Sequence, residues 1–368
     1  MRGSPPPEPV PVSVLTGFLG AGKTTLLNRL LADPAARDWA VIVNEFGEIG
    51  IDHLLVEQAS EGIVALSGGC LCCTVRGDLV DTLADLLERL GDGRIARLSR
   101  IVVETTGLAD PVPVLQSVMG HPALVQALRL DGVVTLVDAV NAQATLDAHV
   151  EAVRQAAVAD RIVITKSDLA QPGEVAALRG RLRSLNPRAP MLLVSEVADA
   201  TILECGLYDA RTKSADVARW LGEAHQHHDH GAHAHHDHGH GHHDARIVSR
   251  TLVHDGPVPF AAIDAFIDLL RTTHGERLLR LKGIVELAED PSRPLVIHGV
   301  RTHIHPPARL RAWPDATRGA RIVVIAMDLP DDYLERLFSA VTGQPRVDAP
   351  DRDAIERNPL AIAGFRGS

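Results

Sequence analysis

Short apolar runs rich in β-branched residues recur along the first half of the chain and alternate with amphipathic or polar segments. Runs of this length and composition are typical of strands buried on both faces of a parallel sheet. They occupy residues 12–16, 39–43, 63–66, 101–103, 133–137, 161–164 and 191–194. A helix is expected from Gly77 to Leu90, because its leucines fall on one face. The alternation predicts an α/β fold with a doubly wound, mostly parallel sheet.

The second half of the chain has a different pattern. Between His225 and His243, eleven of nineteen residues are histidine, so this stretch lacks the apolar residues of a core. Beyond it, strands are expected at 247–253, 278–287, 294–298 and 321–327, and helices at 260–271 and 330–341. We therefore divide the chain into a flexible N-terminus (1–11), an α/β domain (12–222), a His-rich linker (223–245), a smaller α+β domain (246–343) and a loose tail (344–368).

Composition excludes some functions. The net charge of −10 over 368 residues argues against a nucleic-acid partner, and no apolar run approaches the ~20 residues of a membrane span. The N-terminus lacks the apolar centre of a signal peptide. Three of the four cysteines lie within Cys70–Cys73, a spacing unlike a disulfide framework, so a reducing cytoplasm is expected. The oligomeric state is left open.

The segment from Gly17 to Thr25 reads GFLGAGKTT and satisfies the phosphate-loop pattern G-x-x-x-x-G-K-[ST]. It follows an expected strand and precedes a segment of helical composition, as that pattern requires. Glycines let the backbone approach an anion, and the helix N-terminus then faces the phosphates. Lys23 would neutralise the β- and γ-phosphates, and the Thr24 hydroxyl would bind magnesium. The expected nucleotide contacts are Gly17, Gly20, Ala21, Gly22, Lys23, Thr24 and Thr25.

Two further segments follow expected strands. Glu104-Thr105-Thr106-Gly107 places a carboxylate where it would hold a magnesium-bound or attacking water, and Gly107 would offer its N–H to the γ-phosphate. A simple helix cap is the alternative for Glu104. In Thr165-Lys166-Ser167-Asp168, the Asp168 carboxylate would accept both adjacent donors of guanine, which predicts GTP rather than ATP. Lys166 would lie along the base, and Ser195 would close its other side.

Cys70, Cys72 and Cys73 are three thiols within four residues and suit zinc or another thiophilic ion. Three ligands leave a fourth position for Glu48, a histidine, water or a partner protein. Such an incomplete shell favours a site that passes its metal on. The histidine run would add weaker metal sites, with a solvated linker as the alternative. Cys205 stands alone and is interpreted as a packing residue.

Together these motifs resemble the CobW-like metallochaperone GTPases. The resemblance is carried by GFLGAGKTT at 17–25, NEFGE at 44–48, GCLCC at 69–73 and ETTG at 104–107, and it covers about Val10 to Gly343. In the second domain, Leu281-Lys282-Gly283 lies where an R-x-K-G-like motif is usual. The resemblance implies GTP hydrolysis coupled to delivery of zinc, or in some members cobalt, to a client apo-metalloprotein.

The resemblance also implies residue roles. Residues 44–50 would be a nucleotide-sensing switch, and the three cysteines the transferable metal site. Some relatives have a carboxylate where Val43 stands, which favours Glu48 as the fourth ligand. Thr165 replaces the asparagine that is usual in N-K-x-D, which implies weaker support for the phosphate loop. Two alternatives remain from the residues alone: a zinc or cobalt store with little GTP turnover, and a small-molecule kinase.

Overall fold

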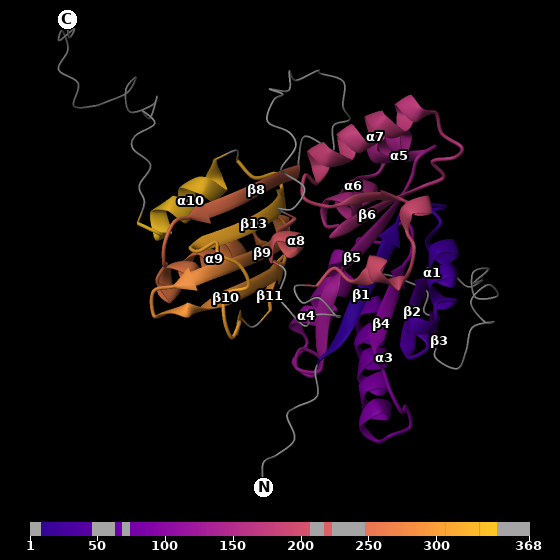
Figure 1. Cartoon of the computed structure of the whole chain (residues 1–368), viewed down its shortest axis with the longest axis horizontal. Coiled ribbons are helices and arrows are strands. Elements are labelled where there is room, and N and C mark those ends of the chain that lie inside the picture. The colour runs from indigo at the N-terminus through magenta and orange to yellow at the C-terminus, as the bar shows by residue number, and fades with distance from the viewer. Residues whose placement is uncertain are drawn as a thin grey trace, which may run out of the picture.

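The computed structural model describes residues 9–45, 63–67, 74–206, 217–222, 247–305, 307–330 and 332–343, which fold around two β-sheets (Figure 1). The first sheet has seven strands, all parallel, in the order β3-β2-β4-β1-β5-β6-β7. Its strands are β1 (Val10–Gly17), β2 (Trp39–Glu45), β3 (Ile63–Ser67), β4 (Arg100–Thr105), β5 (Leu128–Asp138), β6 (Arg161–Thr165) and β7 (Met191–Leu193). This confirms the predicted parallel α/β fold.

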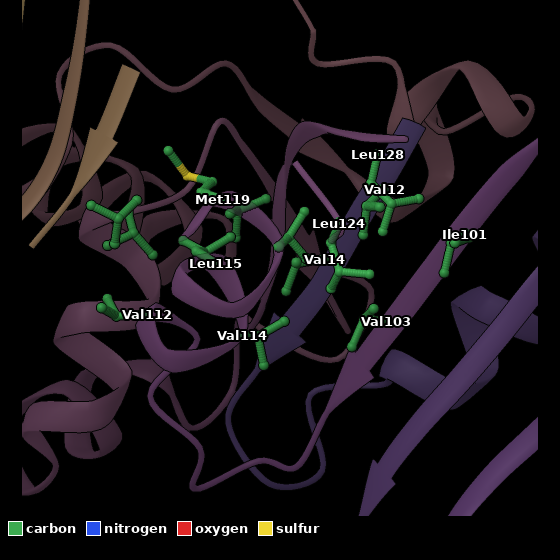
Figure 2. Packing of buried hydrophobic residues seen from close by; sticks show 14 of the residues in the cluster. Val12, Val14, Ile101, Val103, Val112, Val114, Leu115, Met119, Leu124 and Leu128 are labelled. Carbon is green, nitrogen blue, oxygen red and sulfur yellow. The ribbon is translucent and has the colours of Figure 1, made fainter. Parts of the chain in front are cut away.

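Helices cover both faces of this sheet because its strands are apolar on both sides. On β1, Val12 and Val14 pack toward one face, whereas Leu15 packs toward the other. The first face is covered by α3 and α4; Figure 2 shows valines of β1 and β4 packed against Leu115 of α4. The helices are α1 (Lys23–Leu31), α3 (Thr74–Gly91), α4 (Val112–Gly120), α5 (Ala142–Ala148), α6 (Val150–Ala157), α7 (Pro172–Leu185) and α8 (Val217–Leu221). No helix among the described residues is long and apolar enough to cross a bilayer.

Some predicted boundaries are wrong; for example, β5 begins at Leu128 rather than at residue 133. Helix α3 begins at Thr74 rather than at Gly77 and ends at Gly91. The leucine stripe that indicated this helix starts only at Leu79, so the first turn contains none of the leucines that indicated it. A glycine inside a helix costs only about 1 kcal/mol relative to alanine, so Gly77 does not end it.

The second sheet is antiparallel, with the order β11-β10-β9-β13-β8 and β12 paired with β10. Its strands are β8 (Ile247–His254), β9 (Leu278–Leu287), β10 (Asp290–Val300), β11 (His303–Ile304), β12 (Ala308–Arg309) and β13 (Ala320–Met327). Helices α9 (Phe260–His274) and α10 (Tyr333–Val341) cover one face, where Phe266 and Phe338 meet edge to face. This is the α+β arrangement that the sequence predicts. The two-residue strands β11 and β12 were not predicted, because two residues show no periodicity.

The opposite face of the second sheet packs against the first unit. Val323 and Ile325 of β13 belong to the same apolar cluster as α3, α4 and Trp220 of α8. Helix α8 lies between the two sheets (Figure 1). All residues of β9 and β13 are buried, because helices cover one face and the first unit covers the other.

Candidate nucleotide site and its connections

The loop between β1 and α1 has the backbone of an anion cradle. Gly22 caps α1 with a left-handed φ of 89°, which an L-residue with a side chain rarely adopts. Helix α1 begins at Lys23, so its first N–H groups point into the loop without intrahelical acceptors. The Lys23 ammonium donates to the carbonyl oxygens of Gly17 (3.0 Å) and Phe18 (3.3 Å). It therefore lies over the loop where phosphate oxygens would replace these carbonyls.

Two threonines connect this loop to the end of β4. The Thr24 hydroxyl donates to Oε1 of Glu104 at 3.0 Å, and the Thr105 hydroxyl donates to that of Thr16 at 2.7 Å. Glu104 is only 5% exposed. A hydroxyl beside a buried carboxylate is a set of hard oxygen donors, which fits magnesium rather than a thiophilic ion.

The loop after β4 touches the phosphate loop directly. A Cβ on Gly107 would lie 2.4 Å from the Leu19 amide nitrogen, so only glycine allows this approach. The buried side chain of Gln155 donates to the carbonyl oxygens of Gly107 (3.1 Å) and Ala109 (2.9 Å). Gln155 thus holds the 107–109 segment against α6. It was not singled out in the sequence, where it looks like an ordinary helical glutamine.

Thr165 contacts the phosphate loop directly, and whether it supports the loop less well than asparagine would stays a prediction. Its hydroxyl is buried and donates to the Ala21 carbonyl oxygen at 2.9 Å. One hydroxyl donor is enough for this contact, because the end of β6 places Thr165 against the loop. The absence of asparagine therefore does not leave the loop without support.

Lys166 is held by Asp138, a residue to which the sequence analysis assigned no role. Its ammonium forms an ion pair with Asp138, with a nitrogen–oxygen distance of 2.7 Å, and its own φ is 55°. Burial opposes ionisation of Asp138, but hydrogen bonds from Lys166, Asn141 and the Val140 amide outweigh it and lower the pKa of Asp138. Asp138 and Thr165 are register partners on adjacent strands, so the pairing follows from sheet order. The signal in the sequence was an aspartate ending an expected strand.

Asp168 and Ser195 are both exposed. Asp168 lies in the turn after β6, and Ser195 lies in a short 3₁₀ helix, Val194–Glu196, after β7. Because β6 and β7 are adjacent and parallel, the two side chains lie at the same edge of the sheet as Lys23. Their exposure leaves them accessible to a ligand.

The predicted metal residues Cys70, Cys72, Cys73 and Glu48 lie outside the described residues, as do residues 46–50 of the predicted switch and the His-rich linker. Within the described ranges, no group of three or more histidine, cysteine, aspartate or glutamate residues is placed to hold a metal ion. Cys205 is buried in an apolar cluster, as its interpretation as a packing residue predicts. Burial raises the pKa of the Cys205 thiol to about 11, which favours the protonated thiol at neutral pH.

Asp110 connects the 107–109 segment to the second unit. Its carboxylate accepts from Arg154 of α6 (3.3 Å), from Arg301 after β10 (3.2 Å) and from the Val112 amide (3.0 Å). Next to it, Gln116 of α4 contacts His303 of β11 at 3.2 Å. These residues were not predicted, because their partners are almost 200 positions away in the sequence.

Comparison with known proteins is consistent with this geometry. The CobW/HypB/UreG nucleotide-binding domain family matches residues 11–193, and the cobalamin synthesis protein CobW C-terminal domain family matches residues 247–342. The zinc chaperone YjiA of Escherichia coli is 34% identical over 337 residues, which cover 91% of this chain and 99% of that protein. The chain belongs to the CobW family.

Other members of the CobW family are similar over comparable lengths. The zinc chaperone CobW of a Sinorhizobium species is 33% identical over 360 residues, covering 89% of this chain and 95% of that protein. The crystal structure of Zn(II)-bound YjiA GTPase from E. coli matches with a TM-score of 0.65 and 32% identity, covering 91% of this chain and 99% of that one. Both units described above are thus shared with the CobW family.

Proposed function

We propose that this protein is a GTPase that binds zinc and transfers it to a client apo-metalloprotein. The observation that carries the proposal is the full-length similarity to the Zn(II)-bound YjiA GTPase, combined with the contacts around Lys23, Thr24 and Glu104. Relatives named zinc chaperones support zinc as the metal, with cobalt as a second candidate. A reducing cytoplasm would keep the cysteine thiols available to the metal.

For hydrolysis, Lys23 neutralises charge on the β- and γ-phosphates, while Gly107 offers its N–H to the γ-phosphate. Glu104 would hold a magnesium-bound or attacking water, and the Thr24 hydroxyl would bind the magnesium ion. The ion, when bound, would offset the charge that develops on the phosphate oxygens. Because the Gly107 segment already touches Leu19, a small movement brings it to the γ-phosphate.

For the base, Asp168 accepts from the two adjacent donors of guanine, and Ser195 closes the opposite side. Lys166 lies with its aliphatic stem along the ring and keeps its ammonium on Asp138. The ion pair fixes Lys166 before nucleotide arrives, so less rotamer entropy is lost on binding. Adenine presents an acceptor toward Asp168 and would leave its carboxylate unpaired.

For the metal, Cys70, Cys72 and Cys73 supply three thiolates and Glu48 the fourth ligand. Soft sulfur donors suit zinc and exclude magnesium, which separates this site from the one at Thr24. An expected outcome follows: full-length protein purified without a tag contains about one zinc, and Cys72→Ala loses it. Elemental analysis measures the metal, and Cys205→Ala is the matched control that keeps it.

The same protein preparations distinguish a zinc chaperone from a zinc-storage protein. GTP turnover that rises when an apo-metalloenzyme is added, together with metal transfer to it, supports delivery. Turnover that no apo-metalloenzyme changes supports storage instead. A preference for ATP over GTP in direct competition would contradict the guanine site and revive the kinase interpretation.

Nucleotide and zinc should affect each other's binding. If both prefer one conformation of residues 44–50, each strengthens binding of the other by an equal factor. We expect zinc affinity to be higher with a non-hydrolysable GTP analogue than with GDP, by about 5- to 150-fold for an ordinary coupling free energy. A chelator competition assay measures both affinities, with Asp290→Asn at an exposed ion pair as the control variant. Equal zinc affinities with the GTP analogue and with GDP would contradict the coupling mechanism.

A further inference from the structure

A cavity lies between the two units at the edge of the first sheet opposite the phosphate loop. It measures about 550 Å³ including the part open to solvent. Asp160 and Arg161, at the start of β6, line one side, and Arg280 and Lys282 of β9 line the other. Trp220 of α8 completes the wall. The proposed nucleotide, metal and base contacts described above leave this cavity unused.

The charges that line the cavity do not balance. Four cations face it, from Arg161, Arg188, Arg280 and Lys282, but Asp160 is the one carboxylate among the described lining residues. That carboxylate already accepts three hydrogen bonds. It accepts from the Val133 amide (2.8 Å), from Arg280 (2.9 Å) and from Lys282. The excess positive charge therefore lies in a site with little solvent to screen it.

Arg280 carries the strongest signal for a ligand. Its side chain is only 4% exposed, and one terminal nitrogen is used by Asp160. Its Nε and Nη1 groups are buried with no hydrogen-bond acceptor among the described residues. Leaving a buried donor unpaired is unfavourable, and more so for a charged group. Nothing in the packing of β9 requires these donors, so a ligand that accepts from them would recover this cost.

The rest of the wall selects the kind of ligand. Lys282 donates to the Trp220 carbonyl oxygen (3.1 Å) and lies 5.2 Å from the centre of its ring. His298 is the register partner of Lys282 and lies half-buried, with its ring centre 6.1 Å from that of Trp220. Burial, Arg280, Lys282 and His305 hold the pKa of His298 well below its ordinary value, as expected in a positive field. Guanidinium donors in such a field match the oxygens of a carboxylate or phosphate.

We propose that this cavity binds a small oxyanion, with Arg280 as its principal donor and Lys282 contributing charge. The ligand would neutralise part of the excess charge and supply acceptors to the Arg280 Nε and Nη1 groups. Arg280 and Lys282 are the cationic positions of Arg280-Leu281-Lys282-Gly283, so this segment acquires a binding role between the two units. This site is separate from the nucleotide site, and its occupation does not depend on the proposed GTPase.

The test uses the full chain with magnesium and a non-hydrolysable GTP analogue, which keep the added anion out of the phosphate loop. Sodium phosphate, sodium acetate and sodium chloride are titrated at equal ionic strength while the melting temperature is followed. We expect the melting temperature to rise and saturate with phosphate or acetate but not with chloride. Response to acetate alone identifies a carboxylate, and response to phosphate identifies a phosphate oxyanion. Calorimetric titration with inorganic phosphate or acetate should fit one site.

Variants locate the effect. Arg280→Met should abolish the saturating rise while leaving Asp160 paired with Lys282, and Arg271→Met on the exposed face of α9 should retain it. If Arg280→Met fails to fold, Arg280→Lys keeps the charge with fewer donors and should weaken anion binding about tenfold. An equal rise in the wild type and in Arg280→Met, or an equal rise with chloride, would overturn the proposal.

Discussion

Replacing Asp160 with alanine is expected to lower the free energy of unfolding by about 3–5 kcal/mol. Asp160 is the carboxylate between Arg280 and Lys282, which are both buried at the interface of the two units. Without it, two cations stay buried with no counter-charge, and the Val133 amide loses its acceptor. Because the cluster joins the units, the unfolding transition should also split into two.

Chemical denaturation followed by circular dichroism measures this change. Asp268→Ala, which breaks an exposed ion pair on α9, is the matched control and should change stability by less than about 1 kcal/mol. Combining Asp160→Ala with Arg280→Met and Lys282→Met should recover much of the loss, because the buried charges are then gone. A single, unshifted transition for Asp160→Ala would show that the cluster does not hold the units together.

Acid should reproduce part of this effect in the wild type. Burial opposes ionisation of Asp160, but Arg280 and Lys282 outweigh it and hold the pKa of Asp160 below its ordinary value. Its contribution is therefore present above the unfolded-state pKa and is lost as the pH falls through the lower folded-state pKa. The Asp160→Ala variant should lack this component of the pH dependence.

Replacing Lys23 with alanine is expected to reduce GTP turnover by about 10²- to 10³-fold, the usual effect of removing one preorganised charge at a transition state. The same change removes the bonds to Gly17 and Phe18, so the loop should also bind GDP less tightly. Phosphate release measures turnover, and titration calorimetry measures binding. Arg37→Ala, at an exposed position after α1, is the control.

Lys23→Ala also tests the link between the two proposed sites. If zinc affinity responds to nucleotide through residues 44–50, zinc binding in this variant should no longer differ between the two nucleotide states. Turnover within threefold of the wild type would contradict the assigned role of Lys23. If the variant keeps its GTP turnover but its zinc affinity no longer depends on the nucleotide, Lys23 couples the two sites and does not contribute to hydrolysis.

The fold was largely predictable because its information is local. Buried parallel strands such as β1 are continuous apolar runs. The segment Gly17–Thr25 contains the glycines of a tight turn and the lysine of a phosphate site, and a segment of helical composition follows it. The second sheet was predictable for a similar reason, since β13 is a mostly apolar run and β9 contains apolar residues throughout its length. The placement of the polar residues that follow β4 and β6 at one edge of the sheet was predictable because parallel strands bring their carboxyl ends together.

The connections between units were not predictable, because their partners are far apart in the sequence. Arg280 and Lys282 alternate with apolar residues on β9, a pattern that indicates one solvent-exposed face. In the structure that face meets Asp160, and β9 is buried on both sides. Asp110 likewise looked like a loop aspartate until Arg301 was placed beside it. Tertiary packing, rather than local preference, determines these contacts.

Helix α8 and strand β8 are held by the same part of the core. Trp220 and Leu221 are buried at the interface between the units, and the chain turns at Gly222 with a φ of 72°. Ile247, the first residue of β8, packs against the same apolar cluster. A substitution that loosens this cluster would therefore release the end of α8 and the start of β8 together, although residues 222–246 separate the two elements in the sequence.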